Sequence, residues 1–329
     1  MHRADFTRAL KRGAQTAVLV AALVAPVAAA GGASADPAPN VMDVSVYSPA
    51  MGRDIRLNII RPNDASVPRP TLYLLNGAAG GEEPPWDWLV HTDVASFVAD
   101  KKVNVVIPIG GKQSYYTDWL RDDPVLGRNK WTTFFTQELP PAINSMLGTN
   151  GLNAIAGISM SASALLSLAE QAPGLYRSAS AYSGCAGTSD PLGSAFVRAV
   201  VEVRGGGNTM NMWGPEGSPE WLRNDALLNA DKLRGTALYI SAGNGLPGQF
   251  DNLGGRNVEG SPGMLLSQML VGGSIETIVN ACTRALQAKL DSLGIPATYN
   301  FRPAGTHSWD YWQDDLHRSW PIIAASLGV

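Results

Sequence analysis

The chain has 329 residues, a formal net charge of −3 at pH 7 and only 16% charged residues. With 45% hydrophobic residues and many Gly and Pro, this composition excludes a disordered chain and indicates a globular protein rich in loops. The acidic balance argues against a nucleic-acid partner, because a protein that binds nucleic acid needs a basic surface.

Residues 1–35 have the features of an export signal. A basic start precedes the short apolar run "AVLVAALVAPVAAA", and "ASA" then matches a small-residue cleavage site. We expect cleavage after Ala35 and a secreted mature chain of residues 36–329 with a net charge of −6. The alternative is a membrane anchor, which the short apolar run and Pro26 disfavour. No repeat or linker divides residues 36–329, so we expect a single domain.

Short runs of apolar and β-branched residues recur along the mature chain. The runs at 41–48 and 54–60 flank the turn "PAMG" and predict an opening hairpin. Six further runs are mostly continuously apolar, as in strands that are buried on both faces of a parallel sheet. They lie at 70–77, 103–110, 153–159, 178–184, 237–243 and 297–303.

Helix-like segments separate many of these runs, at 130–147, 162–172, 275–294 and 311–327. This alternation predicts a doubly wound α/β fold with a mostly parallel central sheet between helices. In such sheets, functional residues gather in the loops at the carboxyl ends of the strands.

The stretch "GISMS" (157–161) lies between a predicted strand and a predicted helix. A nucleophilic serine on a sharp strand-to-helix turn needs small neighbours, and Gly157 and Ser161 are small. Ser161 stands where the usual GxSxG pattern has its second Gly. Ser159 is therefore a candidate nucleophile, and the alternative is an ordinary serine that caps the helix.

A catalytic serine needs a base, which is usually a histidine. The mature chain has three, His91, His307 and His317. His307 lies between the last predicted strand and the last predicted helix, which fits the α/β-hydrolase order of Ser, acid and His. His91 precedes Ser159, and His317 lies inside a predicted helix.

The acid is expected between Ser159 and His307, in the loops after the strand at 237–243. The candidates are Asp251, Glu259 and Glu276. Glu276 opens a predicted helix, where an acidic residue also interacts favourably with the helix dipole. Reasoning from the residues alone leaves the choice open.

The chain resembles the antigen 85 (mycolyltransferase) family of secreted α/β-hydrolase acyltransferases. The resemblance covers nearly all of the mature chain. The stretches that carry it are "PAMGRDIRLNI", "YLLNG", "VIPIGG", "SYYTDW", "KWTTFFTQELP", "GISMS", "NMWGPEGSPEWLRND", "SAGNG", "LGGRN" and "GTHSWDYW".

This resemblance implies a catalytic triad and an oxyanion hole. "GISMS" matches the nucleophile motif of the family and implies Ser159, while "GTHSW" matches its histidine motif and implies His307. The family's acid is a Glu a little over thirty residues before this His, which here points to Glu276, 31 residues before it. The backbone N–H groups of Met160 and Ala78 are the implied oxyanion donors.

The chain differs from the best-known family members at two positions that concern sugar binding. Asn76 and Ala79 stand where the best-known members have an Asp and an Arg that help to hold a trehalose head group. Asn76 is still expected to donate a hydrogen bond to a substrate hydroxyl, and Trp309 either lines the acyl or sugar site or packs. Three aromatic residues could stack on sugar but are expected mainly in the core: Tyr115, Tyr116 and Trp119.

The implied function is the transfer of a mycolyl group from a donor such as trehalose monomycolate to a sugar hydroxyl. One rival is a secreted carboxylesterase, in which water takes the acyl group. Another is a non-catalytic paralogue that binds cell wall or matrix, which the presence of Ser159 and His307 argues against. No metal or organic cofactor is expected, because the sequence has no CxxC or Cys/His zinc spacing.

The chain has two cysteines, Cys185 and Cys282. In an exported protein two cysteines more often pair than stay free. If Glu276 reaches His307, its helix begins beside the carboxyl ends of the central strands, where Cys185 also lies. We therefore expect a Cys185–Cys282 disulfide, and the alternative is two buried thiols.

Overall fold

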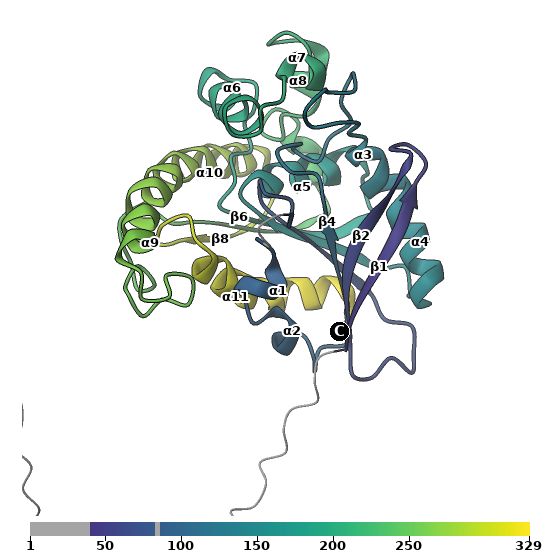
Figure 1. Cartoon of the computed structure of the whole chain (residues 1–329). Helices are drawn as coiled ribbons and strands as arrows, with labels where there is room; N and C mark the ends of the chain where they lie inside the picture. Colours follow the sequence, from purple (N-terminus) through teal and green to yellow (C-terminus); the bar gives the residue numbers. More distant parts are fainter. Residues whose placement is uncertain (1–39, 83–85) are drawn as a thin grey trace, which may run out of the picture. The chain divides into compact units, whose positions relative to one another are not determined.

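One mixed sheet forms the centre of the molecule in the computed structural model, which describes residues 40–82 and 86–329 (Figure 1). Eight strands make up this sheet among the described residues, in the order β1-β2-β4-β3-β5-β6-β7-β8. The β1–β2 and β2–β4 pairs are antiparallel and the others are parallel. The strands are β1 (Asn40–Ser48), β2 (Arg53–Arg61), β3 (Thr71–Leu75), β4 (Asn104–Ile109), β5 (Asn153–Ile158), β6 (Tyr176–Tyr182), β7 (Ala237–Ala242) and β8 (Thr298–Phe301).

The predicted hairpin and the six further predicted strands are confirmed, and so is the α/β-hydrolase fold class. β3 and β5 are buried along their whole length, as their continuous apolar runs predict. Successive residues of β3 face two different cores, since Tyr73 and Leu75 belong to one cluster, and Leu72 and Leu74 to the other. The signal predicted for residues 1–35 lies outside the described residues.

Helices cover both faces of the sheet (Figure 1). On one face lie α5 (Met160–Gln171) and α10 (Gly273–Leu293), and the other face is covered by α11 (Trp309–Leu327) with α1 (Trp88–His91) and α2 (Val94–Phe97). Small side chains such as Ala162 and Ala164 allow α5 to be buried almost completely against β5 and β6. Because β5, β6, β7 and β8 run parallel, their carboxyl ends lie on the same side of the sheet, where the loops of the site meet.

The predicted helix at 130–147 is present as three consecutive segments, α3 (Trp131–Thr133), the π-helical η1 (Phe134–Glu138) and α4 (Leu139–Leu147). Several short helical segments were not expected from the sequence. They are α6 (Pro191–Arg198), η2 (Ala199–Arg204), α7 (Thr209–Met212), α8 (Pro219–Arg223), η3 (Ala230–Leu233), α9 (Pro262–Ser267) and η4 (Gln268–Gly272). Within the described ranges, no helix has the length and apolar character needed to cross a bilayer.

Candidate active site

Ser159 lies on a sharp turn between β5 and α5. Its φ and ψ of 56° and −124° are unusual for a residue with a side chain, and such backbone conformations cost on the order of 1–3 kcal/mol. Its N–H donates to the carbonyl of Tyr182 on β6 at 2.9 Å, which helps to hold the strained turn. The turn leaves Ser159 half-buried between neighbours that are fully buried.

The small neighbours of Ser159 are required by packing. A Cβ atom at Gly157 would lie 2.5 Å from Ser161 Oγ, so a larger residue at 157 would collide with it. Ser161 is fully buried, and its Oγ accepts a hydrogen bond from the N–H of Ile158 at 2.9 Å. The same hydroxyl can donate to the carbonyl of Ile158 at 2.9 Å or of Leu75 at 3.3 Å. Ser161 thus ties the turn to the strand ends and faces away from solvent.

His307 and Glu276 complete a hydrogen-bonded line with Ser159. His307 Nε2 lies 2.8 Å from Ser159 Oγ, and His307 Nδ1 lies 2.7 Å from Glu276 Oε2. Because an ionised carboxylate only accepts, the Nδ1–H donates to Glu276 and leaves Nε2 free to accept the Ser159 proton. The structure therefore brings together the three residues that the sequence and the resemblance single out.

The second oxygen of the Glu276 carboxylate is also occupied. Glu276 is fully buried in the first turn of α10. Its Oε1 accepts from Ser183 Oγ at 2.8 Å and from the N–H of Gly243 at 2.6 Å, with an Arg302 Nη2 atom at 3.5 Å. These donors hold the carboxylate in place beside His307.

The other acid candidates lie elsewhere. Asp251 accepts from the hydroxyls of Thr306 at 2.5 Å and Tyr311 at 2.7 Å, so it supports the loop of His307 without contacting the imidazole. Glu259 is exposed. Among the other histidines, His317 pairs with Asp93 at 2.9 Å.

The two expected oxyanion donors, Ala78 and Met160, follow β3 and Ser159 in the chain. The loop after β3 passes beside the serine, since a Cβ atom at Gly77 would lie 3.5 Å from Ser159 Cβ. Ala78 is the next residue of that loop. A hydrogen bond from the N–H of Gln113 to the Ala78 carbonyl, at 2.8 Å, holds it in place. Met160 is the first residue of α5, where an N–H has no partner within the helix. Neither N–H donates to another residue that the structure describes.

The sequence matches known proteins over almost its whole length. Residues 48–321 match the esterase family model described as "Putative esterase". The chain is 34% identical over 335 residues to the diacylglycerol acyltransferase/mycolyltransferase Ag85A of Mycobacterium tuberculosis (strain ATCC 25618 / H37Rv), covering 98% of this chain and 93% of the relative. It is 31% identical to Ag85B of Mycobacterium avium, covering 98% and 94%. The chain belongs to the antigen 85 mycolyltransferase family.

Solved structures agree on the fold. MPT51 (FbpC1) of Mycobacterium tuberculosis superposes with a TM-score of 0.72 at 24% identity, covering 87% of this chain and 98% of MPT51. The serine hydrolase FphF of Staphylococcus aureus gives a TM-score of 0.62 at 16% identity, covering 87% and 99%. The α/β-hydrolase fold of this antigen 85 family member is thus shared with serine hydrolases outside the family.

Asn76 and Trp309, the two residues for which substrate contacts are expected, are both buried in this structure. Asn76 is fully buried, because its Nδ2 donates to the carbonyl of Pro108 on β4 at 3.1 Å. Only 5% of Trp309 is exposed, because its ring is stacked on His91 at 5.1 Å and meets Trp88 edge-on at 5.5 Å.

His91 belongs to an aromatic stack that the sequence did not reveal. Its ring lies between Trp309 and the partly exposed Trp86, each with a centroid distance of 5.1 Å, and its Nδ1 lies 2.5 Å from Asn257 Oδ1. The stack continues to His307 through Trp312. The Trp312 ring meets Trp309 edge-on, and its centroid lies 4.9 Å from that of the His307 ring. A second group of aromatic residues was expected in the core, and this is confirmed. At most 2% of each side chain is exposed in Tyr115, Tyr116 and Trp119.

An uncharged, exposed segment borders His307. Residues 261–275 contain no charged side chain, and Met264, Leu266, Leu270 and Val271 are each between 45% and 61% exposed. These residues form α9 and η4, which run directly into α10 (Figure 1). The segment ends at the site, because the N–H of His307 donates to the carbonyl of Gly272 at 3.2 Å. Within the described part of the chain, no group of three or more His, Cys, Asp or Glu residues has the arrangement of a metal site.

Proposed function

We propose that the protein is a secreted serine acyltransferase that moves a mycolyl or similar long-chain acyl group between sugar hydroxyls. The observation that supports this proposal is the hydrogen-bonded line from Ser159 through His307 to Glu276. A donor such as trehalose monomycolate and a trehalose or cell-wall sugar acceptor follow from membership of the antigen 85 family. Export is supported by the basic and apolar start of the chain and by its disulfide, which persists in oxidising compartments.

In the first half of the reaction, the Ser159 hydroxyl oxygen attacks the carbonyl carbon of the donor ester while its proton passes to His307 Nε2. Glu276 stabilises the imidazolium that forms. The N–H groups of Ala78 and Met160 donate to the oxyanion, and each donor is worth roughly 3–4 kcal/mol in the transition state. The bond to the sugar oxygen of the donor then breaks, and that oxygen takes the proton from His307, which leaves the acyl group on Ser159.

In the second half, an acceptor hydroxyl gives its proton to His307 and attacks the acyl carbon. The bond to Ser159 breaks, and the serine oxygen recovers a proton from His307. The uncharged segment of residues 261–275 beside His307 supports a long apolar acyl group, because contact with its exposed Leu and Met side chains would remove apolar surface from water.

The second candidate is a carboxylesterase with the same triad. The observation that favours it is that Ser159 is only half-buried. Water can then compete for the acyl-enzyme. The buried Asn76 and the small Ala79 also leave the trehalose contacts of the best-known members without their Asp and Arg.

Incubation of the purified protein with trehalose monomycolate tests the proposal. Trehalose dimycolate is expected, free mycolate alone would favour the esterase, and neither product would favour a non-catalytic binding protein. Ser159→Ala is the control and should abolish turnover. A serine-directed covalent inhibitor should label Ser159 in the native protein, and a label on Ser161 or Ser163 would contradict the assignment.

A further inference from the structure

Arg302 lies behind the acid of the triad. It follows β8, and its N–H donates to the carbonyl of Ala242 at the end of β7 at 2.9 Å. Only 9% of its side chain is exposed, so the guanidinium is held by protein groups. One Nη atom lies 3.5 Å from Glu276 Oε1, and the other forms an ion pair with Asp315. A single buried cation thus lies between two buried carboxylates.

Asp315 fixes the position of this cation. The carboxylate is fully buried on α11 and accepts hydrogen bonds from the Tyr239 hydroxyl at 3.2 Å and from Asn300 Nδ2 at 3.0 Å. These two donors come from β7 and β8, while Asp315 itself lies on α11. Because donors from two strands hold the Asp315 carboxylate, the guanidinium paired with it has little freedom to leave Glu276.

The flat face of Arg302 supports the histidine loop as well. Its Cζ lies 5.1 Å from the centre of the Tyr311 ring, a distance typical of a cation–π contact. The Tyr311 hydroxyl donates to Asp251, which also accepts from the Thr306 hydroxyl. Thr306 directly precedes His307. Arg302 therefore contacts the acid directly and the base through a short chain of neighbours.

We propose that Arg302 is a positioning residue that holds the Glu276 carboxylate aimed at His307. The proposal rests on the proposed function of the Ser159–His307–Glu276 line. A cation within about 4 Å favours the charged form of a carboxylate, and without it Glu276 and Asp315 would be two buried anions with fewer donors. The charged and titratable groups around Arg302 are Glu276, Asp315, His307, Asp251, Tyr239, Tyr311, Asp314 and Arg318.

Arg302→Met tests this role with a short, soluble ester. We expect kcat to fall about 10- to 100-fold with KM changed less than about threefold. The acid limb of the kcat/KM pH profile should move at least about half a unit to higher pH. Loss of the cation makes Glu276 easier to protonate and His307 easier to charge, and both effects act in this direction. A merely structural role would change stability without moving the limb. Arg302→Lys should restore part of the shift.

Arg318→Met is the matched control. Arg318 lines the same 320 Å³ pocket as Arg302, but it pairs with Asp314 and is exposed. This variant should keep the wild-type profile. If Arg302→Met does not fold, the Arg302→Met/Asp315→Leu double variant removes both buried charges and should show a smaller shift in the same direction.

A folded Arg302→Met enzyme with unchanged kcat and an unchanged acid limb overturns the proposal. That result leaves the proposed function intact as long as the wild-type protein turns over the ester and Ser159→Ala does not. Loss of the Ser159 dependence would instead contradict the proposed function itself.

Discussion

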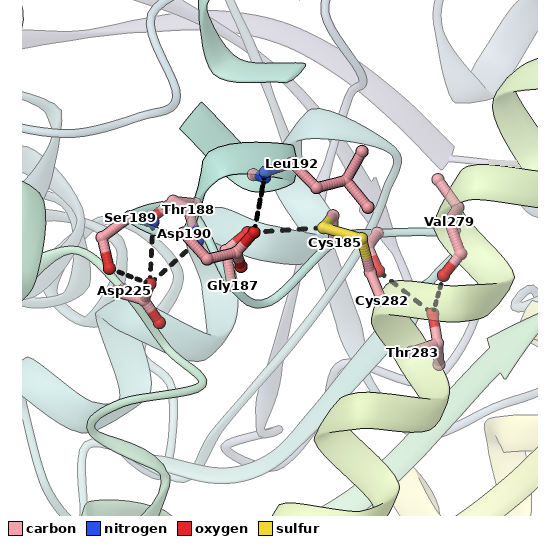
Figure 2. Close-up of a disulfide and its surroundings, with 12 residues drawn as sticks. Cys185, Gly187, Thr188, Ser189, Asp190, Leu192, Asp225, Val279, Cys282 and Thr283 are labelled. Atoms are coloured by element: carbon pink, nitrogen blue, oxygen red, sulfur yellow. Dashed lines mark hydrogen bonds between the residues drawn. A yellow bond between two sulfur atoms is a disulfide. The ribbon is translucent and has the colours of Figure 1, made fainter. Parts of the chain in front are cut away.

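Cys185 and Cys282 form a disulfide that joins the loop after β6 to the helix of Glu276 (Figure 2). Their Cα atoms are 5.0 Å apart and both side chains are buried. The two residues before Cys185 contact the same helix, since Ser183 donates to Glu276 and Gly184 accepts from Thr283 at 3.2 Å. The predicted disulfide is confirmed, and it connects the sheet next to Ser159 with the helix of Glu276.

Removal of this disulfide should destabilise the protein. The cysteines are 97 residues apart, for which the chain-entropy model gives about 4–5 kcal/mol of the free energy of unfolding. A Cys185→Ser/Cys282→Ser variant should therefore unfold at lower urea concentration, with lower kcat because the Glu276 helix is less restrained. Wild-type protein with reductant should match the variant. A wild-type midpoint that is the same with and without reductant would contradict this prediction.

Replacement of the acid should separate Glu276 from Asp251. Glu276→Gln keeps the shape but loses the charge that stabilises imidazolium, and we expect kcat to fall about 10³- to 10⁴-fold. Asp251→Asn weakens the support of Thr306 and Tyr311 without a direct effect on the imidazole, so a fall of about tenfold or less is expected. Steady-state kinetics on a short ester measures both, with circular dichroism to check folding. The reverse ranking would show that the acid is misassigned.

The fold was largely predictable, because a strand buried on both faces leaves a continuous apolar run in the sequence. β3 and β5 carry this signal, and their order with the helices fixed the positions of Ser159 and His307 in loops. Helices of four or five residues such as α7 and α8 complete too little of a helical period to be seen. They are stabilised by tertiary contacts, such as the edge-to-face pair of Trp213 and Trp221.

The site was predictable only in part. Asp251 and Glu276 both reach the histidine loop, one at Thr306 and the other at His307, so sequence position alone could not choose between them. The burial of Asn76 depends on the carbonyl of Pro108, 32 residues away on a neighbouring strand. Arg302 gave no signal, because its partners Glu276 and Asp315 meet only in the folded molecule.

The serine at position 161 gives a test of the turn. Ser161→Ala leaves the buried N–H of Ile158 without its acceptor, which should lower the free energy of unfolding by about 1–3 kcal/mol. Labelling of Ser159 by a serine-directed inhibitor should persist, since the Ser161 hydroxyl faces the strand ends. Urea unfolding and mass spectrometry give the two readouts. Loss of the label in Ser161→Ala but not in Ser159→Ala would exchange the roles of the two serines.

Glu170 should make stability depend on pH. It is 2% exposed on α5, and neither of its carboxyl oxygens has a hydrogen-bond partner among the described residues. Burial raises the pKa of Glu170 from 4.5 to about 9. Because the folded protein holds this proton more tightly than the unfolded chain, the free energy of unfolding is highest below about pH 4.5. It falls as the pH rises towards 9.

Glu170→Gln removes this titration while it keeps the shape. The variant should match the wild type near pH 4.5 and become more stable relative to it as the pH rises, by on the order of 3 kcal/mol at pH 7. Urea unfolding at pH 5, 7 and 9 measures the difference. Glu259→Gln, at an exposed position, should follow the wild-type curve. Parallel curves for wild type and Glu170→Gln from pH 5 to 9 would show that the ionised carboxylate is tolerated at this position in the folded protein.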